Sequence, residues 1–508
     1  MQNPPLSPKK APSFWGGVVG LLIILWVLPG FASEPVTDAS ITYWVRDALR
    51  NDPRIDMTDI LVTTKYGIVN LAGSVTNLAA KQYADLEAKK IHGVASVENN
   101  LVLSPMGIPD AAVEQQIRRR LVNSAVIESQ GIQVKVEHGT AWLTGTVATW
   151  TEGQEAELLA EETRGVREVK NEITVDVPTK RNDQEIQADV IGALARNVYL
   201  TGFPITITVQ NGTVTLKGSV GNSYETIKAQ KIAGRIMGVQ DIHNQLQVDD
   251  SQNRGAREAV PILSNDRVRG NVRQELAQDN RIDASDISIE GAYGHITLDG
   301  SVNSLYEKHL AEHDVRDVVG VGWVTNNLVV RSTHHEDWAV AEDVEYALKT
   351  DVALQHEDFS ARTRNGIVIL SGKTHAWWAR LHAQRVASKI TGVKRVLNKI
   401  TLIDVIPSSD YALTKAVEDR LTWNWVTYKF HDGITVAVRN GVATLSGEVD
   451  WWSQRKEAGT VAYKTQGIWL VDNRITVKYY EYPWKEWEYG GDYHSKPPAD
   501  YHMIYDME

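Results

Sequence analysis

One spacing of residues recurs six times along this chain and constrains its fold more than any other feature. The pattern is Gly-x3-Leu-x-Gly-x19-Gly-Val-x4-Asn, with Ile replacing Val in the last copy. Successive copies lie 72, 73, 82, 72 and 75 residues apart. A register kept over six copies indicates a tandem array of small domains rather than one large domain with a single active site. The closing glycines of the six Gly-x3-Leu-x-Gly motifs are Gly73, Gly145, Gly218, Gly300, Gly372 and Gly447.

Each copy predicts the order helix, strand, strand, helix, strand, which makes the chain an α+β protein. Apolar residues recur at helical spacing in the first segment and alternate in the strands. Asn211-Gly212 favours a tight hairpin turn, because both residues tolerate positive φ. Gly238 is expected to cap the second helix. In the third copy the predicted elements are helices at 183–196 and 223–236 and strands at 205–209, 214–220 and 239–248.

The copies define six units joined by short links, most of which contain proline. The longest link, 251–264, accounts for the 82-residue step and divides the array three plus three. We expect it to act as a hinge. The units are numbered 1 to 6 and span residues 38–104, 110–177, 182–250, 265–333, 338–404 and 410–477.

Charge and cysteine content exclude several classes of function. The formal net charge of −11 argues against a chain-wide nucleic-acid or anionic-lipid surface, which would have to be basic. With no cysteine, the chain has no disulfide, thiolate metal site or cysteine nucleophile.

The N-terminus has the pattern of an export signal. Lys9-Lys10 precede an uncharged stretch, 11–33, with an apolar centre at 18–28 and small residues near its end. This predicts a signal peptide over 1–33, and the alternative is an uncleaved inner-membrane anchor through 11–33, which is nearly long enough to span a bilayer. Either reading predicts export to the periplasm.

The repeated unit resembles the BON (bacterial OsmY and nodulation) domain family over residues 38–477. The resemblance rests on the Gly-x3-Leu-x-Gly and Gly-Val…Asn register. It implies an exported, non-enzymatic module without cofactors that binds phospholipid or other envelope components, or mediates protein assembly, and so supports envelope integrity or stress tolerance. The shared glycines, leucines and asparagines are expected to maintain the fold, so function is sought where the copies differ.

Unit 5 differs most, because residues 372–402 contain seven Lys or Arg and no Asp or Glu. On its second helix, Trp378, His382, Arg385 and Lys389 share one stripe at about 100° per residue. An exposed stripe of this kind suits an anionic headgroup layer. The alternative is a solvated face with Trp378 packed on a neighbouring unit. The predicted lipid-binding residues are Trp377, Trp378, Arg380, His382, Arg385, Lys389, Lys394 and Arg395.

A tail of different composition follows unit 6. Residues 478–508 contain nine Tyr or Trp, seven acidic and three basic residues. One interpretation is a tail packed on unit 6, and the other is a strap for protein partners, since Tyr and Trp are frequent at binding hot spots. The predicted partner-binding residues are Trp484, Trp487, Tyr489 and Tyr493.

Catalytic and metal-binding signals are weak. His309 and His313 are four residues apart on a helix, but no third ligand is evident, so no metal site is predicted. No hydrolase triad order, zinc-protease motif or phosphate loop occurs. The sequence therefore predicts a non-enzymatic envelope protein that contacts anionic phospholipid, and the alternative is a scaffold or homo-oligomer that binds other envelope proteins.

Overall fold

The computed structural model describes residues 36–477, except 53, 105–106, 178–180, 250–262, 332–334, 355, 376 and 404–408. The predicted signal or anchor segment and the aromatic tail lie outside the described residues, as does most of the 251–264 link. The six repeat units all lie within one compact body that begins at Thr37.

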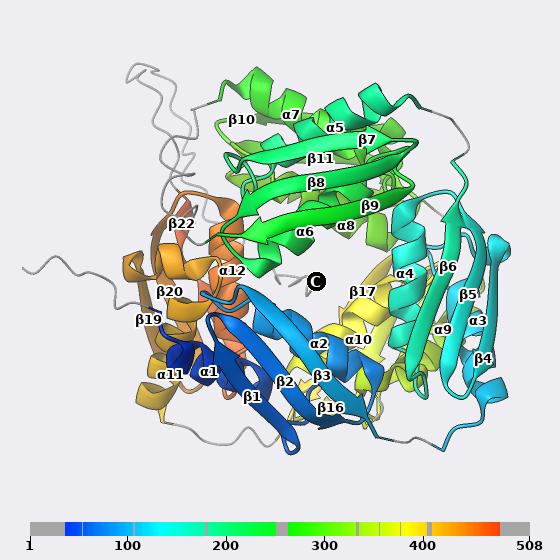
Figure 1. Ribbon diagram of the computed structural model, residues 1–508, viewed down its shortest axis with the longest axis horizontal. Coiled ribbons are helices and arrows are strands. Elements are labelled where there is room, and N and C mark those ends of the chain that lie inside the picture. Colours follow the sequence, from blue (N-terminus) through cyan, green and yellow to red (C-terminus); the bar gives the residue numbers. More distant parts are fainter. Residues whose placement is uncertain are drawn as a thin grey trace, which may run out of the picture. The chain divides into compact units, whose positions relative to one another are not determined.

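Every unit has the predicted order of elements (Figure 1). The first helices are α1 (Asp38–Arg50), α3 (Asp110–Val122), α5 (Asp183–Arg196), α7 (Asn265–Gln278), α9 (Asp337–Thr350) and α11 (Asp410–Trp423). The second helices are α2 (Leu78–Lys89), α4 (Trp150–Glu161), α6 (Ser223–Gly234), α8 (Leu305–Arg316), α10 (Trp377–Ser388) and α12 (Trp452–Tyr463).

Each unit contains a small mixed sheet, in which the return strand of the hairpin lies in the middle, and in unit 5 two further short strands form a separate parallel pair. The third strand pairs with the return strand in parallel, after the crossover through the second helix. The hairpins are β1 (Ile60–Lys65) with β2 (Ile68–Val75), β4 (Ile132–Glu137) with β5 (Thr140–Val147), β7 (Ile205–Gln210) with β8 (Thr213–Val220), β10 (Ile287–Ala292) with β11 (His295–Val302), β14 (Ser360–Arg364) with β15 (Ile367–Ser371), and β19 (Ile434–Arg439) with β20 (Val442–Val449).

The third strand is continuous in units 1 to 3 and broken in units 4 to 6. Unit 5 also carries a short extension of its middle strand, β16 (Lys373–Thr374). The continuous third strands are β3 (Ser96–Leu103), β6 (Glu168–Val175) and β9 (Asp241–Val248). The broken ones are β12 (Trp323–Asn326) with β13 (Val329–Val330), β17 (Arg395–Asn398) with β18 (Thr401–Leu402), and β21 (Leu470–Asn473) with β22 (Thr476–Val477).

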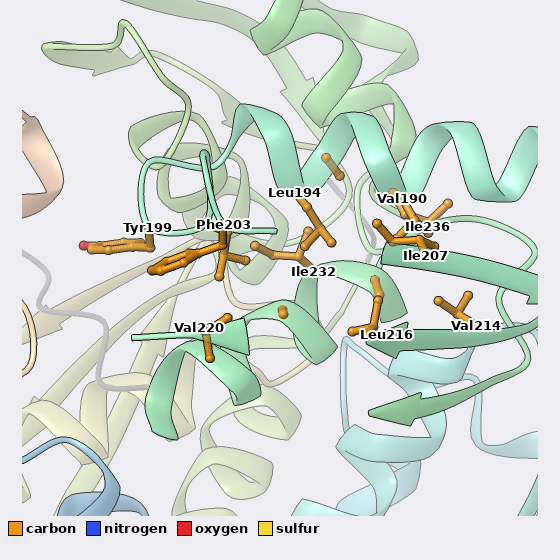
Figure 2. Close-up of a cluster of buried hydrophobic side chains, with 14 of the residues drawn as sticks. Val190, Leu194, Tyr199, Phe203, Ile207, Val214, Leu216, Val220, Ile232 and Ile236 are labelled. Carbon is orange, nitrogen blue, oxygen red and sulfur yellow. The ribbon is translucent and has the colours of Figure 1, made fainter. Parts of the chain in front are cut away.

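Unit 3 shows how one unit builds its core. Side chains from both helices and both hairpin strands meet on one face of the sheet (Figure 2). Val190, Val214 and Leu216 are fully buried. Because strand side chains alternate between faces, the other face of the sheet is left to the surface.

Two polar contacts repeat from unit to unit and hold the elements in register. The Asp183 carboxylate at the start of α5 accepts hydrogen bonds from the backbone N–H of Asn211 at 2.8 Å and of Gly212 at 3.0 Å, which ties the hairpin tip to the helix. The Asn244 amide donates to the Thr226 carbonyl of α6 at 2.9 Å. The repeated asparagine thus satisfies local backbone groups, as expected.

The predicted end of the second helix is two residues too late. Helix α6 ends at Gly234, and Gly238, at φ 97°, lies in the turn beyond it. The helix closes with tighter turns, in which the N–H of Ile236 donates to the Ala233 carbonyl at 3.2 Å, and Ile236 also forms an antiparallel bridge with Asp279 of unit 4. Its backbone therefore pairs with another unit instead of continuing the helix.

Bridges of this kind pair unit 1 with unit 6, unit 2 with unit 5, and unit 3 with unit 4. Each joins a residue just beyond a first helix to one just beyond a second helix of the partner. The two bridges between units 3 and 4 are reciprocal, and so are the two between units 2 and 5. The chain therefore folds back on itself. The bridges are Ile91 with Asn424, Ser124 with Ile390, Thr163 with Asp351, Asn197 with Val318, and Ile236 with Asp279.

Candidate functional site

The helical stripe predicted to contact lipid is buried between units. Trp378 is only 2 % exposed, and its ring stacks on His382 with centroids 4.5 Å apart. His382 is fully buried, and its Nε2 lies 2.9 Å from Asp351 Oδ1. The Arg54 guanidinium of unit 1 lies 5.1 Å from the Trp378 ring. The expectation of an exposed stripe is therefore wrong, because α10 packs against units 1 and 2.

The basic members of the stripe are paired with carboxylates of unit 2. Arg385 Nη2 lies 3.4 Å from Glu162 Oε1, and Lys389 Nζ lies 2.8 Å from Glu155 Oε2. Burial alone would lower the pKa of Lys389, but Glu155 raises it to about 12. Burial lowers the pKa of His382, against the opposing effect of Asp351, so the ring is held neutral. These groups join two units and are not displayed to a ligand.

Of the other residues predicted to bind lipid, some are half-buried and one is exposed. Arg380 lies half-buried on α10, and its Nη2 is 3.5 Å from the Asn398 carbonyl. Lys394 lies half-buried with its aliphatic chain beside Gly366 at the hairpin tip. Arg395 is exposed on β17. The side chain of Trp377 lies outside the described residues, as do Trp484, Trp487, Tyr489 and Tyr493 of the tail.

The exposed basic residues of unit 5 lie on its sheet rather than on its second helix. Ala361 and Val368 point into the core, so their neighbours on β14 and β15 point outward. The register places Arg364 beside Ile367 and Arg362 beside Ile369. We call this surface the outward sheet face of unit 5; its exposed cations are Arg362, Arg364, Lys373, Arg395 and Lys399.

Three apolar side chains lie at the centre of this face. Ile367 and Ile369 occupy the middle strand, and Leu397 lies beside Ile369 on β17. Arg395 lies beside Ile367, opposite Arg364, so cations flank the apolar centre on both sides. Among the described residues, none of the five cations of the face forms an ion pair, and none of the outward positions on these strands is acidic.

No other unit has a purely basic sheet face among the strands that the structure describes. In unit 2, for example, outward Lys135 is 2.6 Å from Glu137. In unit 4 the outward residues include Glu290 and Asp299. The outward sheet face of unit 5 is therefore the part of the array best suited to an anionic layer, since its cations meet phosphates and its apolar centre meets the layer behind them.

Sequence reasoning found part of this face and missed the rest. Arg395 was among the predicted residues, but Arg362 and Arg364 precede the basic run that began at Gly372. The signal that could have found them is the period of two: both alternate with the inward Ala361 and Thr363, opposite the apolar strand at 367–371.

The described residues offer little for other chemistry. No group of three or more metal-ligating side chains occurs among them. His313 is buried in the contact between units 3 and 4, and its Nδ1 lies 3.1 Å from Asp314 Oδ1. No helix of the described chain is long and apolar enough to cross a bilayer.

Six α+β units in tandem, with one unit presenting a basic sheet face, define an array of small domains. The chain belongs to the BON domain family. The family's model matches residues 37–105, 109–177, 182–250, 264–332, 336–404 and 409–479, which together make up most of the chain.

Relatives match about a quarter of the chain at a time. The osmotically-inducible protein Y of Escherichia coli (strain K12) is 32% identical over 143 residues, which are 27% of this chain and 71% of that protein. The outer membrane lipoprotein DolP of Haemophilus influenzae is 26% identical over 147 residues, which are 28% of this chain and 76% of that protein.

Among solved structures, the C-terminal domain of CdsD, a structural protein of the type III secretion system of Chlamydia trachomatis, matches at 16% identity. The match covers 42% of this chain and 100% of that one, with a TM-score of 0.12. A likeness this weak does not bear on the arrangement of the units.

Proposed function

We propose that this protein is a non-enzymatic protein of the bacterial envelope that binds anionic membrane surfaces through the outward sheet face of unit 5. The observation that carries the proposal is the ring of five exposed cations around Ile367, Ile369 and Leu397. The family and its relatives support the envelope setting, since one relative is by name an outer membrane lipoprotein and another is osmotically inducible. The export signal predicted at 1–33 supports a periplasmic location.

The size of the interaction follows from the number of cations. Each Lys or Arg near an anionic lipid surface adds about 1 kcal/mol. Five of them supply about 5 kcal/mol at low salt, and the attraction falls within a Debye length of about 10 Å at 0.1 M salt. Binding is therefore expected to be reversible, selective for anionic lipid and weakened by salt. The other units then serve as spacers that fix where unit 5 lies.

Vesicle co-sedimentation tests this proposal. The variant Arg362→Gln, Arg364→Gln, Arg395→Gln removes three cations of the face, which should weaken binding to vesicles containing phosphatidylglycerol by about 100-fold. The wild type should not pellet with phosphatidylcholine vesicles.

The matched control carries the same loss of charge on other units: Lys217→Gln, Arg267→Gln, Arg439→Gln, all exposed. It should bind like the wild type. Equal weakening by both variants would mean that only overall charge matters, and unchanged binding by the first variant would remove unit 5 from the proposal.

A scaffold or self-assembling array is the second candidate. It is favoured by the extended contact faces that the units already use on one another. The described residues engage these faces within the same chain, so assembly between chains would require contacts within one chain to be replaced by contacts between two.

A further inference from the structure

The surface between the two halves of the chain has features of a binding site for a separate partner. One half comprises units 1 to 3 and the other units 4 to 6. In the three pairs, a unit of the first half always contacts a unit of the second. The contacts join residues far apart in sequence, such as Asp47 and Arg420, which are 373 residues apart. The geometry of each pair therefore does not depend on which chain supplies the second half.

Backbone groups contribute to each pair. Between units 3 and 4, the N–H of Val198 donates to the Asp317 carbonyl at 2.8 Å, and the N–H of Val319 donates to the Arg196 carbonyl at 2.8 Å. Between units 1 and 6, the N–H of His92 donates to the Trp423 carbonyl at 2.8 Å. Such short antiparallel ladders fix the register of one unit on the other.

Charges are sorted across the contact between units 3 and 4. Unit 3 contributes Lys228 and Arg235, and unit 4 contributes Asp314 and Asp317. Lys228 Nζ lies 2.7 Å from Asp317 Oδ2, and Arg235 Nη1 lies 2.6 Å from Asp314 Oδ1. All four are buried, so two copies of unit 3 brought together would bury like charges against each other. The sorting favours unit 4, and disfavours a second unit 3, as the partner.

The other two pairs are also held by charge. Arg119 Nη2 of unit 2 lies 2.8 Å from Glu342 Oε1 of unit 5, and Lys464 Nζ of unit 6 lies 3.1 Å from Glu87 Oε1 of unit 1. Each half therefore carries three contact faces that fit the opposite half, and the charges of the pair formed by units 3 and 4 also disfavour pairing of a half with itself.

We propose that these faces also bind the complementary half of a second copy of this chain, so that two chains exchange halves and form a dimer with six matched pairs. The exchange re-forms every contact described above and creates no new one, which is the usual route of domain swapping. The covalent link favours pairing within one chain in dilute solution, because it raises the effective concentration of the partner half. The dimer fraction therefore rises with protein concentration.

Charge reversal in full-length chains tests the proposal. The basic-side variant carries Lys228→Asp and Arg196→Asp, and the acidic-side variant carries Glu275→Arg and Asp317→Lys, since Arg196 Nη2 also lies 3.2 Å from Glu275 Oε2 across this contact. Each is mismatched with itself, whereas exchange between the two gives one native and one reversed contact. We expect equimolar chains refolded together to give a 1:1 dimer by light scattering, at a fraction at least 10-fold above that of either variant alone.

The control is a single chain with all four substitutions, which should be a folded monomer because its charges match again. If that chain folds while the mixture stays monomeric, the proposal is overturned. A second measurement does not depend on these substitutions. Wild-type chains with two different tags, refolded together at increasing concentration, should yield dimers carrying both tags. Their absence at the highest concentration would also overturn the proposal.

Discussion

The substitution Asp314→Asn is expected to lower the free energy of opening the contact between units 3 and 4 by about 3–5 kcal/mol. Asp314 is 1% exposed and lies between two guanidinium groups, with Arg235 Nη1 at 2.6 Å and Arg281 Nη2 at 2.8 Å. Burial raises the pKa of this carboxyl, but Arg235 and Arg281 hold it well below its ordinary value. The substitution removes the carboxylate that lies 2.6 Å from the buried Arg235 guanidinium, which costs more than the loss of one hydrogen bond.

Amide hydrogen exchange measures this effect locally, which suits a chain of six units that need not unfold in one step. The reporters are the N–H groups of Asn280 and Val319, which bond across the contact to Arg235 and Arg196. Their exchange should speed up by about 100-fold or more. The control Asp472→Asn makes the same change in an exposed ion pair with Arg474 and should change stability by less than about 0.5 kcal/mol. Equal effects of the two substitutions would contradict the sorted contact.

The substitution Gly218→Ala is expected to destabilise unit 3 by about 2–5 kcal/mol, from overpacking and backbone strain together. Gly218 has a φ of 129°, which residues with a Cβ rarely adopt. A Cβ at this position would lie 2.1 Å from the carbonyl oxygen of Pro204, the residue just before β7. That atom belongs to the backbone, so relief requires β7 and β8 to move apart.

Hydrogen exchange of β7 and β8 checks this prediction. Protection of both strands should fall, whereas the strands of unit 6 should keep theirs. Gly107→Ala is the control, because no atom lies within 4 Å of the Cβ it would add. If Gly218→Ala leaves the strands as protected as Gly107→Ala does, the closing glycine of the motif is not required by close backbone approach.

The repeat unit could be predicted from the sequence because its determinants are local. Helix α5 has the predicted bounds, and β7 and β8 each differ from their predicted bounds by one residue. Asn211 has a φ of 50° at the hairpin tip, as an Asn-Gly turn requires. These features depend on residues a few positions apart, so the repeated pattern was enough to identify them.

The pairing of units could not be predicted, because its determinants lie hundreds of residues apart. Helical spacing correctly grouped Trp378, His382, Arg385 and Lys389 on one side of α10. Spacing does not indicate what covers that side, and here unit 2 does, through Glu155 and Glu162. The same stripe that suits a headgroup layer also suits a buried contact with a carboxylate-rich helix, and only the packing of the chain distinguishes the two.

The basic composition of unit 5 could be read from the sequence, but the place of its exposed cations required the strand register. Arg362 and Arg364 can be assigned to this face only once the register places them beside Ile369 and Ile367, with Arg395 on the other side of the middle strand. We therefore expect unit 5 to meet an anionic membrane with its outward sheet face and not with its second helix.

A fluorescent probe on one introduced cysteine tests which surface of unit 5 contacts the membrane, since the chain has no cysteine of its own. An environment-sensitive dye is attached at Ile369→Cys or at Thr215→Cys, which occupy the same half-buried position on the middle strands of units 5 and 3. With vesicles containing phosphatidylglycerol, emission at position 369 should shift to the blue, and emission at position 215 should stay unchanged. No shift at 369, or equal shifts at both positions, would contradict the assignment of the membrane contact to the outward sheet face of unit 5.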